Sequence, residues 1–437
     1  MKLIYCSLLC SGLLLPLPSW AQSLEQAVSQ TFATNPEIKS AFNEYISKRY
    51  LIDASTGAYK PSLDLDAGIG YEAINPASEI ARGSTEMTRR EASLTLNQLI
   101  WDGSKTLNDI DRASADAESV RLQLLSNAQN TALDVVRVYI ETIEGFEILA
   151  LSESNLATHE KIYVDIKKRT DSGISSTADL TQIEARLAKA HSNLIAAENN
   201  LIDSQTTFIR LVGEAPQSLV FPRADKNFIP LTLELAQEQA YESHPVIKIS
   251  QVDVESAKFQ YKQSQSNYFP TLSFEAKQSW KEDAGGIKGS SDETTAMIRL
   301  NYNLYNGGRD SAKSSEMAYQ LNKAKDLRER AYRSVKEELQ LSWSALEMTS
   351  QQKVFLADHV DSASETVIAY EKQYLIGKRT LLDLLNTENE LFESRKGYVE
   401  AKYSEQYAKY RVLTSTGNLL NALRVNLPKE WTDKVDY

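Results

Sequence analysis

Apolar and polar residues alternate along four short stretches of the chain, which come in two pairs. The first pair covers 62–71 and 92–100, and the second covers 271–280 and 296–304. A period of two indicates β-strands with one apolar face and one polar face. We expect the polar segment 72–90 to join the first two strands. In the first strand the two faces carry Leu63, Leu65, Ala67, Ile69 and Tyr71, and Ser62, Asp64, Asp66, Gly68 and Gly70.

Long helices are predicted after each strand pair, because no proline occurs between Pro76 and Pro216 or between Pro270 and Pro428. The first runs from Ser104 to about Thr170 and is about 100 Å long at about 1.5 Å per residue. Helices of this length favour coiled-coil packing over a globular domain. Turns at Gly173 and Gly377 lead into return helices over about 176–211 and to about 423.

The chain contains two copies of one unit, a pattern that decides the fold class when it is present. LTLNQLIWDG, from Leu94 to Gly103, returns as IRLNYNLYNG from Ile298 to Gly307, an offset of 204 positions. Earlier segments match at an offset of 209, as Pro61 does with Pro270. The second copy is therefore expected to be shorter between the prolines and the turns, where a loop absorbs the change.

Each copy is predicted to contain a short helix, a strand pair, a long helix, a turn and a return helix. A tail after Pro428 is expected to be loosely ordered. The predicted divisions are a signal peptide at 1–21, a first repeat at 22–215 (strand pair about 62–101, helical hairpin about 104–211), a linker at 216–230, a second repeat at 231–427 (strand pair about 271–305, helical hairpin about 310–423), and the tail at 428–437.

The first 21 residues have the form of a secretory signal peptide. Lys2 precedes an apolar run, and Ser19-Trp20-Ala21 fits a small-x-small cleavage site. A membrane anchor is the alternative, but Pro16 and Pro18 interrupt a run that is already short. Both cysteines, Cys6 and Cys10, lie inside this segment. The processed chain is therefore expected to lack disulfides, thiol catalysis and thiolate metal sites.

Composition and motifs give little support for catalysis, a metal site or a cofactor. The four histidines lie far apart in sequence at 159, 191, 244 and 359, without the spacing of metal ligands. Gly68-Ile69-Gly70 lies in a strand pattern and lacks the third glycine of a nucleotide-binding loop. The net charge is −11, and it becomes −12 when Lys2 is removed, which argues against nucleic acid as a partner.

The four strands have the length and alternation of strands that cross a bilayer at a tilt. A soluble hairpin with one buried face gives the same alternation. Aromatic residues favour the membrane reading, because they fall at two levels of the expected hairpins, as in interfacial girdles. Four strands are too few to close a barrel, so we expect several chains to pool strands in a ring. The two aromatic levels are Tyr59, Trp101, Tyr268, Phe269 and Tyr305, and Tyr71 and Trp280.

The two helix turns carry the same motif. Ser176-x-x-Asp179 and Thr380-x-x-Asp383 both fit a capping box, in which a hydroxyl and an acid satisfy the helix start. A second interpretation is that a ring of chains repeats each acid around an axis. The acids would then form an anionic ring that selects cations and gates passage.

The motifs QLIWDG and NLYNGG, the Asn35-Pro36-x-Ile38 start and the turn sequence YLIGKRTLLDLLNTENEL resemble the TolC family of outer-membrane channels. The resemblance covers essentially the whole processed chain. It implies a mainly α fold with a β-barrel part. Three chains would form a 12-stranded outer-membrane barrel, continued by a 12-helix periplasmic α-barrel whose tips close.

The resemblance also implies roles for particular residues. The family's periplasmic gate falls on Tyr374, Arg379 and Asp383 of the second tip and on Asp179 of the first. This sequence departs from the pattern at Asn386, where a second acid would stand. Ala178 likewise replaces a hydroxyl partner. The turns at Gly173 and Gly377 would contact a periplasmic adaptor protein.

The function implied is an exit channel in the outer membrane of a Gram-negative bacterium, with a large periplasmic part and no enzymatic activity. The first tip, RTDSGISSTADLTQIEAR, resembles members that serve type I secretion of large adhesins or RTX-type proteins. Multidrug or metal efflux is the alternative, and a structural envelope coiled coil without a pore is a third hypothesis. Expected partners are two further copies of the chain, the adaptor, an inner-membrane ABC or proton-driven pump, and membrane lipid.

Overall fold

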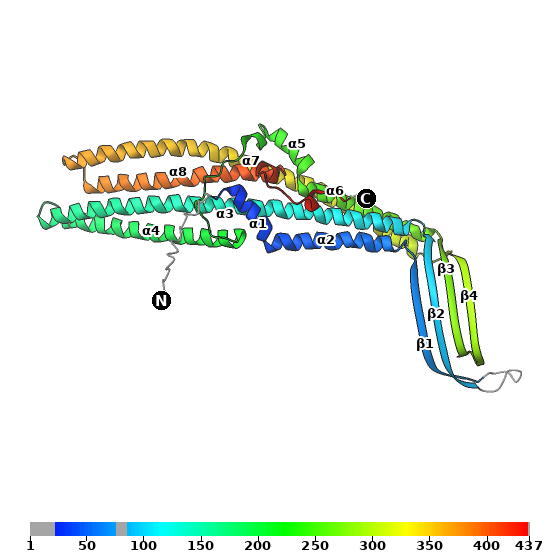
Figure 1. Ribbon diagram of the computed structural model, residues 1–437. Helices are drawn as coiled ribbons and strands as arrows, with labels where there is room; N and C mark the ends of the chain where they lie inside the picture. Colours follow the sequence, from blue (N-terminus) through cyan, green and yellow to red (C-terminus); the bar gives the residue numbers. More distant parts are fainter. Residues whose placement is uncertain (1–21, 76–84, 436–437) are drawn as a thin grey trace, which may run out of the picture. The chain divides into compact units, whose positions relative to one another are not determined.

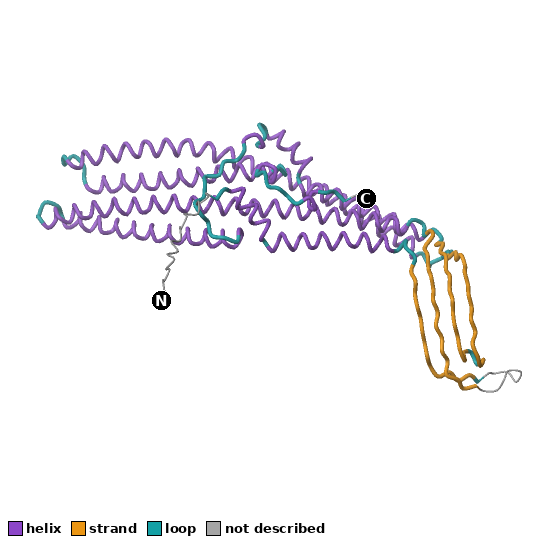
Figure 2. The backbone as a smooth tube through the Cα atoms, in the orientation of Figure 1, coloured by secondary structure: helices purple, strands orange, loops and turns teal. Residues whose placement is uncertain are grey.

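The structure, a computed structural model, describes residues 22–75 and 85–435. The expected signal peptide and part of the polar segment after the first strand lie outside these residues. Helices make up most of the described chain, and the strands form one sheet (Figures 1 and 2). The elements are α1 (Leu24–Thr34), α2 (Pro36–Gly57), β1 (Ser62–Ile74), β2 (Thr85–Trp101), α3 (Lys105–Asp171), α4 (Thr177–Val212), η1 (Lys226–Phe228), α5 (Leu233–Ser243), α6 (Pro245–Gln265), η2 (Ser266–Tyr268), β3 (Thr271–Ala284), β4 (Ile287–Asn301), α7 (Arg309–Leu375), α8 (Leu381–Ser415), α9 (Leu419–Ala422) and α10 (Lys429–Thr432).

The duplicated unit is visible in the order and length of the elements. Helices α3 and α7 each contain 67 residues, and both of their ends match at the offset of 204. The pairs α1 and α2, and α5 and α6, occupy equivalent places before the strands. The mainly α fold with two helix, strand-pair and long-helix units is therefore confirmed.

The four strands form one antiparallel sheet in the order β1-β2-β3-β4 (Figure 1). Each hairpin begins in the same register, since Ser62 pairs with Asn97 and Thr271 pairs with Asn301. The length difference between the two copies therefore lies toward the far ends of the hairpins. Strands β2 and β3 join the two copies, with Asn97 opposite Glu275.

The strands differ from the prediction at several ends. Strand β3 continues to Ala284 and β4 begins at Ile287, both beyond the predicted stretches. Strand β1 continues to Ile74 and β2 begins at Thr85, so much of the polar segment 72–90 is paired strand. A cross-strand ion pair between Arg89 and Glu72, at 2.8 Å, lets these polar positions pair. Strand β4 ends at Asn301, so Leu304 lies outside it. There the side chain of Asn303 accepts a hydrogen bond from the Tyr305 backbone, which competes with strand pairing.

Two compact units can be distinguished, and each combines segments from both copies. The first consists of residues up to Pro36, Ala128–Ala240 and Glu338–Asn426. The second consists of Glu37–Asn127, Tyr241–Glu337 and Leu427–Tyr437 and includes the sheet. Within the first, α1, α3, α4 and α8 enclose an apolar core around Tyr139.

The described part of the tail, residues 428–435, is anchored at Trp431 and Val435, so the expectation of a loosely ordered tail is wrong there. Trp431 in α10 is only 6% exposed, and its ring lies 6.3 Å from that of Phe42. The Arg121 guanidinium donates to the Trp431 carbonyl at 2.7 Å. Glu118 accepts from the Val435 backbone at 3.1 Å. The tail is thus held by an ion-paired couple on α3.

Among the described residues, no helix has both the length and the apolar character that crossing a membrane requires.

Candidate functional site

Two sharp turns connect the long helices to their return helices. Gly173 and Gly377 both have φ +74°, a left-handed conformation that favours glycine. The turns are closed by bonds from Ile174 N to the Arg169 carbonyl and from Lys378 N to the Gln373 carbonyl, at 2.8 and 2.9 Å. A Cβ at either glycine would meet nothing within 4 Å. Backbone conformation, not crowding, therefore requires glycine here.

The capping boxes predicted after the turns are both present. Ser176 N donates to the Asp179 carboxylate at 3.2 Å, and Asp179 N donates back to the Ser176 hydroxyl at 3.1 Å. Thr380 N donates to the Asp383 carboxylate at 3.1 Å, and Asp383 N donates back to the Thr380 hydroxyl at 3.2 Å. Asp179 also accepts from the Ser175 hydroxyl at 2.9 Å. Ser175 thus supplies a hydroxyl partner for Asp179 in the tip where Ala178 lacks one.

Hydrogen bonds lower the pKa of both tip acids. The bond from the Thr380 backbone, followed by that from its hydroxyl, lowers the pKa of Asp383. Partial burial acts to raise the pKa of Asp179, but the bonds from Ser175 and Ser176 outweigh it, and the net shift is downward. The carboxylates of Asp179 and Asp383 are therefore both negatively charged at neutral pH.

Tyr374 lies in a small apolar core that brings the two tips together. This core is formed by α3, α4 and α8, and Tyr374 packs against it from α7. Burial raises the pKa of the Tyr374 phenol, Arg169 opposes the rise, and Asp165 and Asp179 add to it. The Arg169 guanidinium lies 5.6 Å from the ring centroid, a cation–π distance. The core residues are Ile166, Ile183, Leu381 and Leu385.

Arg379 points away from the acid that follows it. Its guanidinium lies over the Tyr370 ring at 4.2 Å, and its Nε donates to the Gln373 side chain at 3.1 Å. It acts on Asp383 only through its field, which lowers the pKa of that acid. Within the described residues, Tyr374, Arg379, Asp179 and Asp383 thus share a region but are not joined by direct hydrogen bonds.

Two contacts between the return helices escaped the sequence-based interpretation. The Arg186 guanidinium donates to the Asn386 side chain at 2.8 Å, and Lys189 donates to Asn389 at 3.2 Å. Each pair joins α4 to α8, and the second pair lies three residues after the first on both helices. The sequence feature that could have indicated these contacts is this matching spacing of two cations and two asparagines. Asn386, noted because it replaces an acid, is therefore a hydrogen-bond acceptor for a cation of the other hairpin.

A cavity of about 460 Å³ lies between α3, α4 and α8 and contains an unusual acid. Burial raises the pKa of Glu144 to about 7, and the carboxylates of Glu400, Glu141 and Glu147 add to the rise. Arg137 and Lys396 line the same cavity. Across the described residues, no cluster of His, Cys, Asp and Glu side chains suits a metal ion.

Glu144→Gln is expected to change the pH dependence of stability. The folded pKa of about 7 lies above the ordinary value of 4.5, so the folded state holds the proton more tightly. Stability should therefore fall as pH rises from about 4.5 to 7. At about 1.4 kcal/mol per pKa unit the full loss is at most about 3 kcal/mol, before solvent screening. The glutamine variant should be the more stable at pH 8 and unchanged near pH 4.5.

Thermal unfolding of detergent-solubilised protein across this pH range would measure the difference. Glu153→Gln, an acid of the same helix outside the cavity, is the control. Equal pH profiles for the wild type and Glu144→Gln would mean that Glu144 ionises normally in the folded protein.

Comparison with known proteins identifies the family. The family model described as outer membrane efflux protein matches residues 27–214 and 236–418, one stretch for each copy of the unit. The chain belongs to the outer membrane efflux protein family. Its members are outer-membrane channels, so the expected outer-membrane location and the resemblance to TolC are confirmed.

Three relatives of the outer membrane efflux protein family match nearly end to end. The outer membrane efflux protein BepC of Brucella suis is 26% identical over 96% of this chain and 90% of its own. The outer membrane protein TolC of Escherichia coli is 22% identical, covering 92% and 83%. The alkaline protease secretion protein AprF of Pseudomonas aeruginosa is also 22% identical, covering 90% and 83%.

Solved structures share the fold of this chain. CusC, a protein that forms a transmembrane channel, superimposes with a TM-score of 0.81 at 13% identity. The superposition covers 90% of this chain and 92% of CusC. This likeness shows the fold. The match to the outer membrane efflux protein family shows that the protein is an export channel of the outer membrane with a large helical periplasmic part.

Proposed function

We propose that the protein is the outer-membrane exit channel of a tripartite export system, serving type I secretion of a large adhesin or RTX-type protein. A homotrimer would form the channel. A periplasmic adaptor and an inner-membrane ABC or proton-driven pump would complete the system. The channel part of this proposal is supported by the four-stranded sheet, which presents exposed apolar side chains and, within the described residues, has no strand paired beyond β1 or β4.

The sheet requires further copies of the chain if it lies in the membrane. Leu65, Ile69 and Ile298 are 71, 74 and 69% exposed, which suits contact with lipid. Unpaired backbone groups at the edges of β1 and β4 would be very unfavourable there. Small transmembrane barrels need about eight strands, and twelve from three copies exceed this minimum. A barrel closed by three copies would therefore pair the edge strands and also contain enough strands to close.

The tip acids are proposed to form the periplasmic gate, with Asp383 at the constriction and Asp179, Tyr374, Arg379 and Asn386 around it. In a ring, the ionised acids repeat around the axis and attract cations. Arg379 has no bond to Asp383, so it leaves that carboxylate free on the side away from its cap. This supports a dual role for Asp383 as helix cap and gate.

Asp383→Asn separates these roles, because the asparagine side chain keeps an acceptor for the Thr380 backbone amide but removes the charge. We expect single-channel conductance to rise and block by polyvalent cations to weaken several-fold. Planar-bilayer recordings on purified trimers would measure both. Asp383→Ala should show the same changes together with a loss of helix stability of about 1 kcal/mol, because it removes the acid of the capping box.

Glu390→Gln is the matched control, since Glu390 is an exposed acid further along α8 that contacts His359. If Asp383→Asn changes conductance no more than Glu390→Gln does, Asp383 is a helix cap only.

The turns are proposed to contact the adaptor. Next to Gly173 and Gly377, the side chains Ile174, Leu375 and Ile376 are 77, 64 and 66% exposed. Apolar side chains on an exposed turn are typical of a protein interface. The left-handed glycines keep the turns compact, so that these side chains project outward.

The proposed cargo rests on the first tip sequence and on AprF, which is named for secretion of a protease. BepC, named as an efflux protein, has the higher identity and favours the alternative of multidrug or metal efflux. In neither case do we expect turnover chemistry in this subunit. The energy would come from the inner-membrane pump, and ATP hydrolysis by the purified protein would contradict this.

A deletion strain distinguishes the two cargoes. Secreted and surface-bound proteins would be compared between the deletion strain, its parent and a strain complemented with the gene. Loss of one very large protein, restored by complementation, supports type I secretion. An unchanged protein profile with increased dye accumulation would assign the channel to efflux.

A further inference from the structure

Two cations lie beside the acids of the proposed gate. The Arg186 guanidinium donates to the Asn386 side chain at 2.8 Å, and the Lys189 ammonium donates to Asn389 at 3.2 Å. Both acceptors are neutral amides, which accept a hydrogen bond without cancelling the charge of the donor. Each contact therefore leaves a full positive charge where α4 meets α8.

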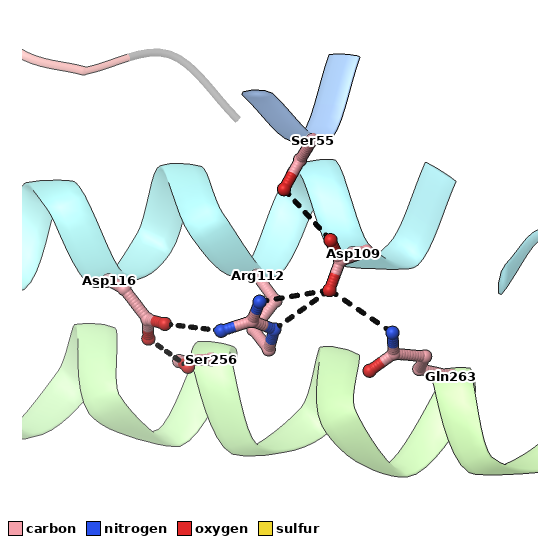
Figure 3. Close-up of polar contacts among 6 residues, drawn as sticks. All are labelled: Ser55, Asp109, Arg112, Asp116, Ser256 and Gln263. Carbon is pink, nitrogen blue, oxygen red and sulfur yellow. Dashed lines mark hydrogen bonds and ion pairs between the residues drawn. The ribbon is translucent and has the colours of Figure 1, made fainter. Parts of the chain in front are cut away.

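A paired arginine of the same chain shows the difference. Arg112 lies between Asp109 and Asp116 on α3, at 2.9 and 2.8 Å, so two carboxylates match its charge (Figure 3). Among the residues that the structure describes, neither Arg186 nor Lys189 has such an ion-pair partner. Their charge is therefore uncompensated in the single chain.

The contacts also fix the level of the cations relative to the acids. The two contacts are in step, so α4 and α8 run side by side in the same direction. Asp383 precedes Asn386 by three residues, which places it about 4.5 Å nearer the turn at about 1.5 Å per residue. Asp179 precedes Arg186 by seven residues, or about 10 Å. From the turns inward, the order is therefore acids first and cations second.

Arg186 reaches the face of α8 that carries Asp383. Residues three apart on a helix are neighbours on its surface, so Asn386 follows Asp383 on that face and brings Arg186 to it. The next acid there, Glu390, lies four residues beyond Asn386 and contacts His359 at 2.9 Å. The level just inside Asp383 is therefore positively charged.

We propose that Arg186 and Lys189 form a cationic layer one turn inside the acidic tips, and that this layer lowers the preference of the channel for cations. The inference rests on the proposed gate at Asp383 and specifies its ion selectivity. In a ring of copies the cationic layer repeats around the axis as the acids do. Rings of acids favour cations and rings of Arg or Lys favour anions. Cargo segments with negative charge are therefore favoured at this level over positively charged ones.

The cationic layer is close enough to the acids to act on the same ion. Its separation from Asp383, about 4.5 Å along the helix, is shorter than the Debye length of about 8 Å at physiological ionic strength. A cation held by the Asp383 carboxylates is therefore repelled by the Arg186 guanidinium groups. The repulsion grows with the charge of the ion, so it weakens the binding of a trivalent ion more than that of K⁺.

Arg186→Gln combined with Lys189→Gln tests the proposal, because glutamine removes both charges but keeps an amide that can donate to Asn386 and Asn389. We expect the ratio of cation to anion permeability to rise several-fold. Block by La³⁺, added on the side of the helical tips, should occur at a several-fold lower concentration. Reversal potentials in a KCl gradient and current block, recorded on purified trimers in planar bilayers, would measure both.

Two further variants separate charge from structure. Arg186→Lys keeps the charge and should keep the selectivity of the wild type. Arg210→Gln is the matched control, since Arg210 is an exposed cation in the last turn of the same helix. If the double glutamine variant changes selectivity and block no more than Arg210→Gln does, the cationic layer does not exist.

Reintroducing an acid gives a second readout. Asn386→Asp should strengthen La³⁺ block only weakly in the wild type, because Arg186 pairs with the new carboxylate. In the Arg186→Gln background the same change should strengthen block several-fold more. Equal gains in the two backgrounds would contradict a charged Arg186 at this level.

Failure of the cationic layer is distinguishable from failure of the gate. If Asp383→Asn weakens La³⁺ block while the double glutamine variant behaves as the wild type, the gate stands and the cationic layer is overturned. If neither change affects block, Asp383 does not line the constriction and both proposals are overturned.

Discussion

Gly103→Ala is expected to impair folding far more than alanine at other left-handed glycines. Gly103 has φ +69°, and a Cβ there would lie 2.7 Å from the Phe269 Cβ and 3.0 Å from the Ser266 carbonyl oxygen. The left-handed conformation alone costs a non-glycine residue about 1 to 2 kcal/mol. Overpacking against neighbours that cannot move adds about 1 to 3 kcal/mol. We therefore expect a total loss of about 2 to 5 kcal/mol.

Gly285→Ala is the matched control, since Gly285 has φ +65° in the same unit but a Cβ there meets nothing within 4 Å. It should lose only the conformational part. Urea unfolding of the purified protein, followed by tryptophan fluorescence, would measure both variants. If both variants lost the same free energy of unfolding, the chain near Phe269 would have to move aside for the added methyl group at no cost.

Gly103 also explains why the strand-to-helix stretch was so informative in the sequence. Strand β2 ends at Trp101 and α3 begins at Lys105, so this stretch contains the end of one element and the start of the next. The close approach of Gly103 to the turn before β3 requires glycine. A conformational requirement of this kind involves only a few adjacent residues, so it can be recognised in the sequence. The same holds for the capping boxes at Asp179 and Asp383, whose partners lie three residues away.

Contacts between distant segments could not be predicted in this way. The Arg186 and Asn386 pair spans 200 positions, and neither residue differs in type from ordinary surface residues of a helix. The extended ends of β1 and β2 contain an ion pair between Glu72 and Arg89, inside a segment whose sequence is typical of a polar loop. Duplication was the one long-range signal available. It placed the ends of α3 and α7 to within about one residue.

The contacts that hold the tail could not be predicted from the sequence either. Arg121→Ala tests whether the buried Arg121 and Glu118 pair holds the tail. Arg121 and Glu118 are paired at 2.7 Å with side chains only 7 and 3% exposed. Removing the guanidinium leaves Glu118 buried without its counter-ion and takes the donor from the Trp431 carbonyl. Breaking a buried pair costs about 3 to 5 kcal/mol. We expect a loss of this size, together with faster amide exchange at Val435.

Lys258→Ala is the control, because Glu255 and Lys258 have the same spacing in the same unit but are 38 and 47% exposed. An exposed pair contributes less than about 1 kcal/mol. Replacing both buried partners, with Glu118→Leu and Arg121→Met, should recover much of the stability, since no charge then remains unpaired. It should not restore protection of Val435, whose amide donates to Glu118. Unchanged exchange at Val435 in Arg121→Ala would show that the packing of Trp431 alone holds the tail.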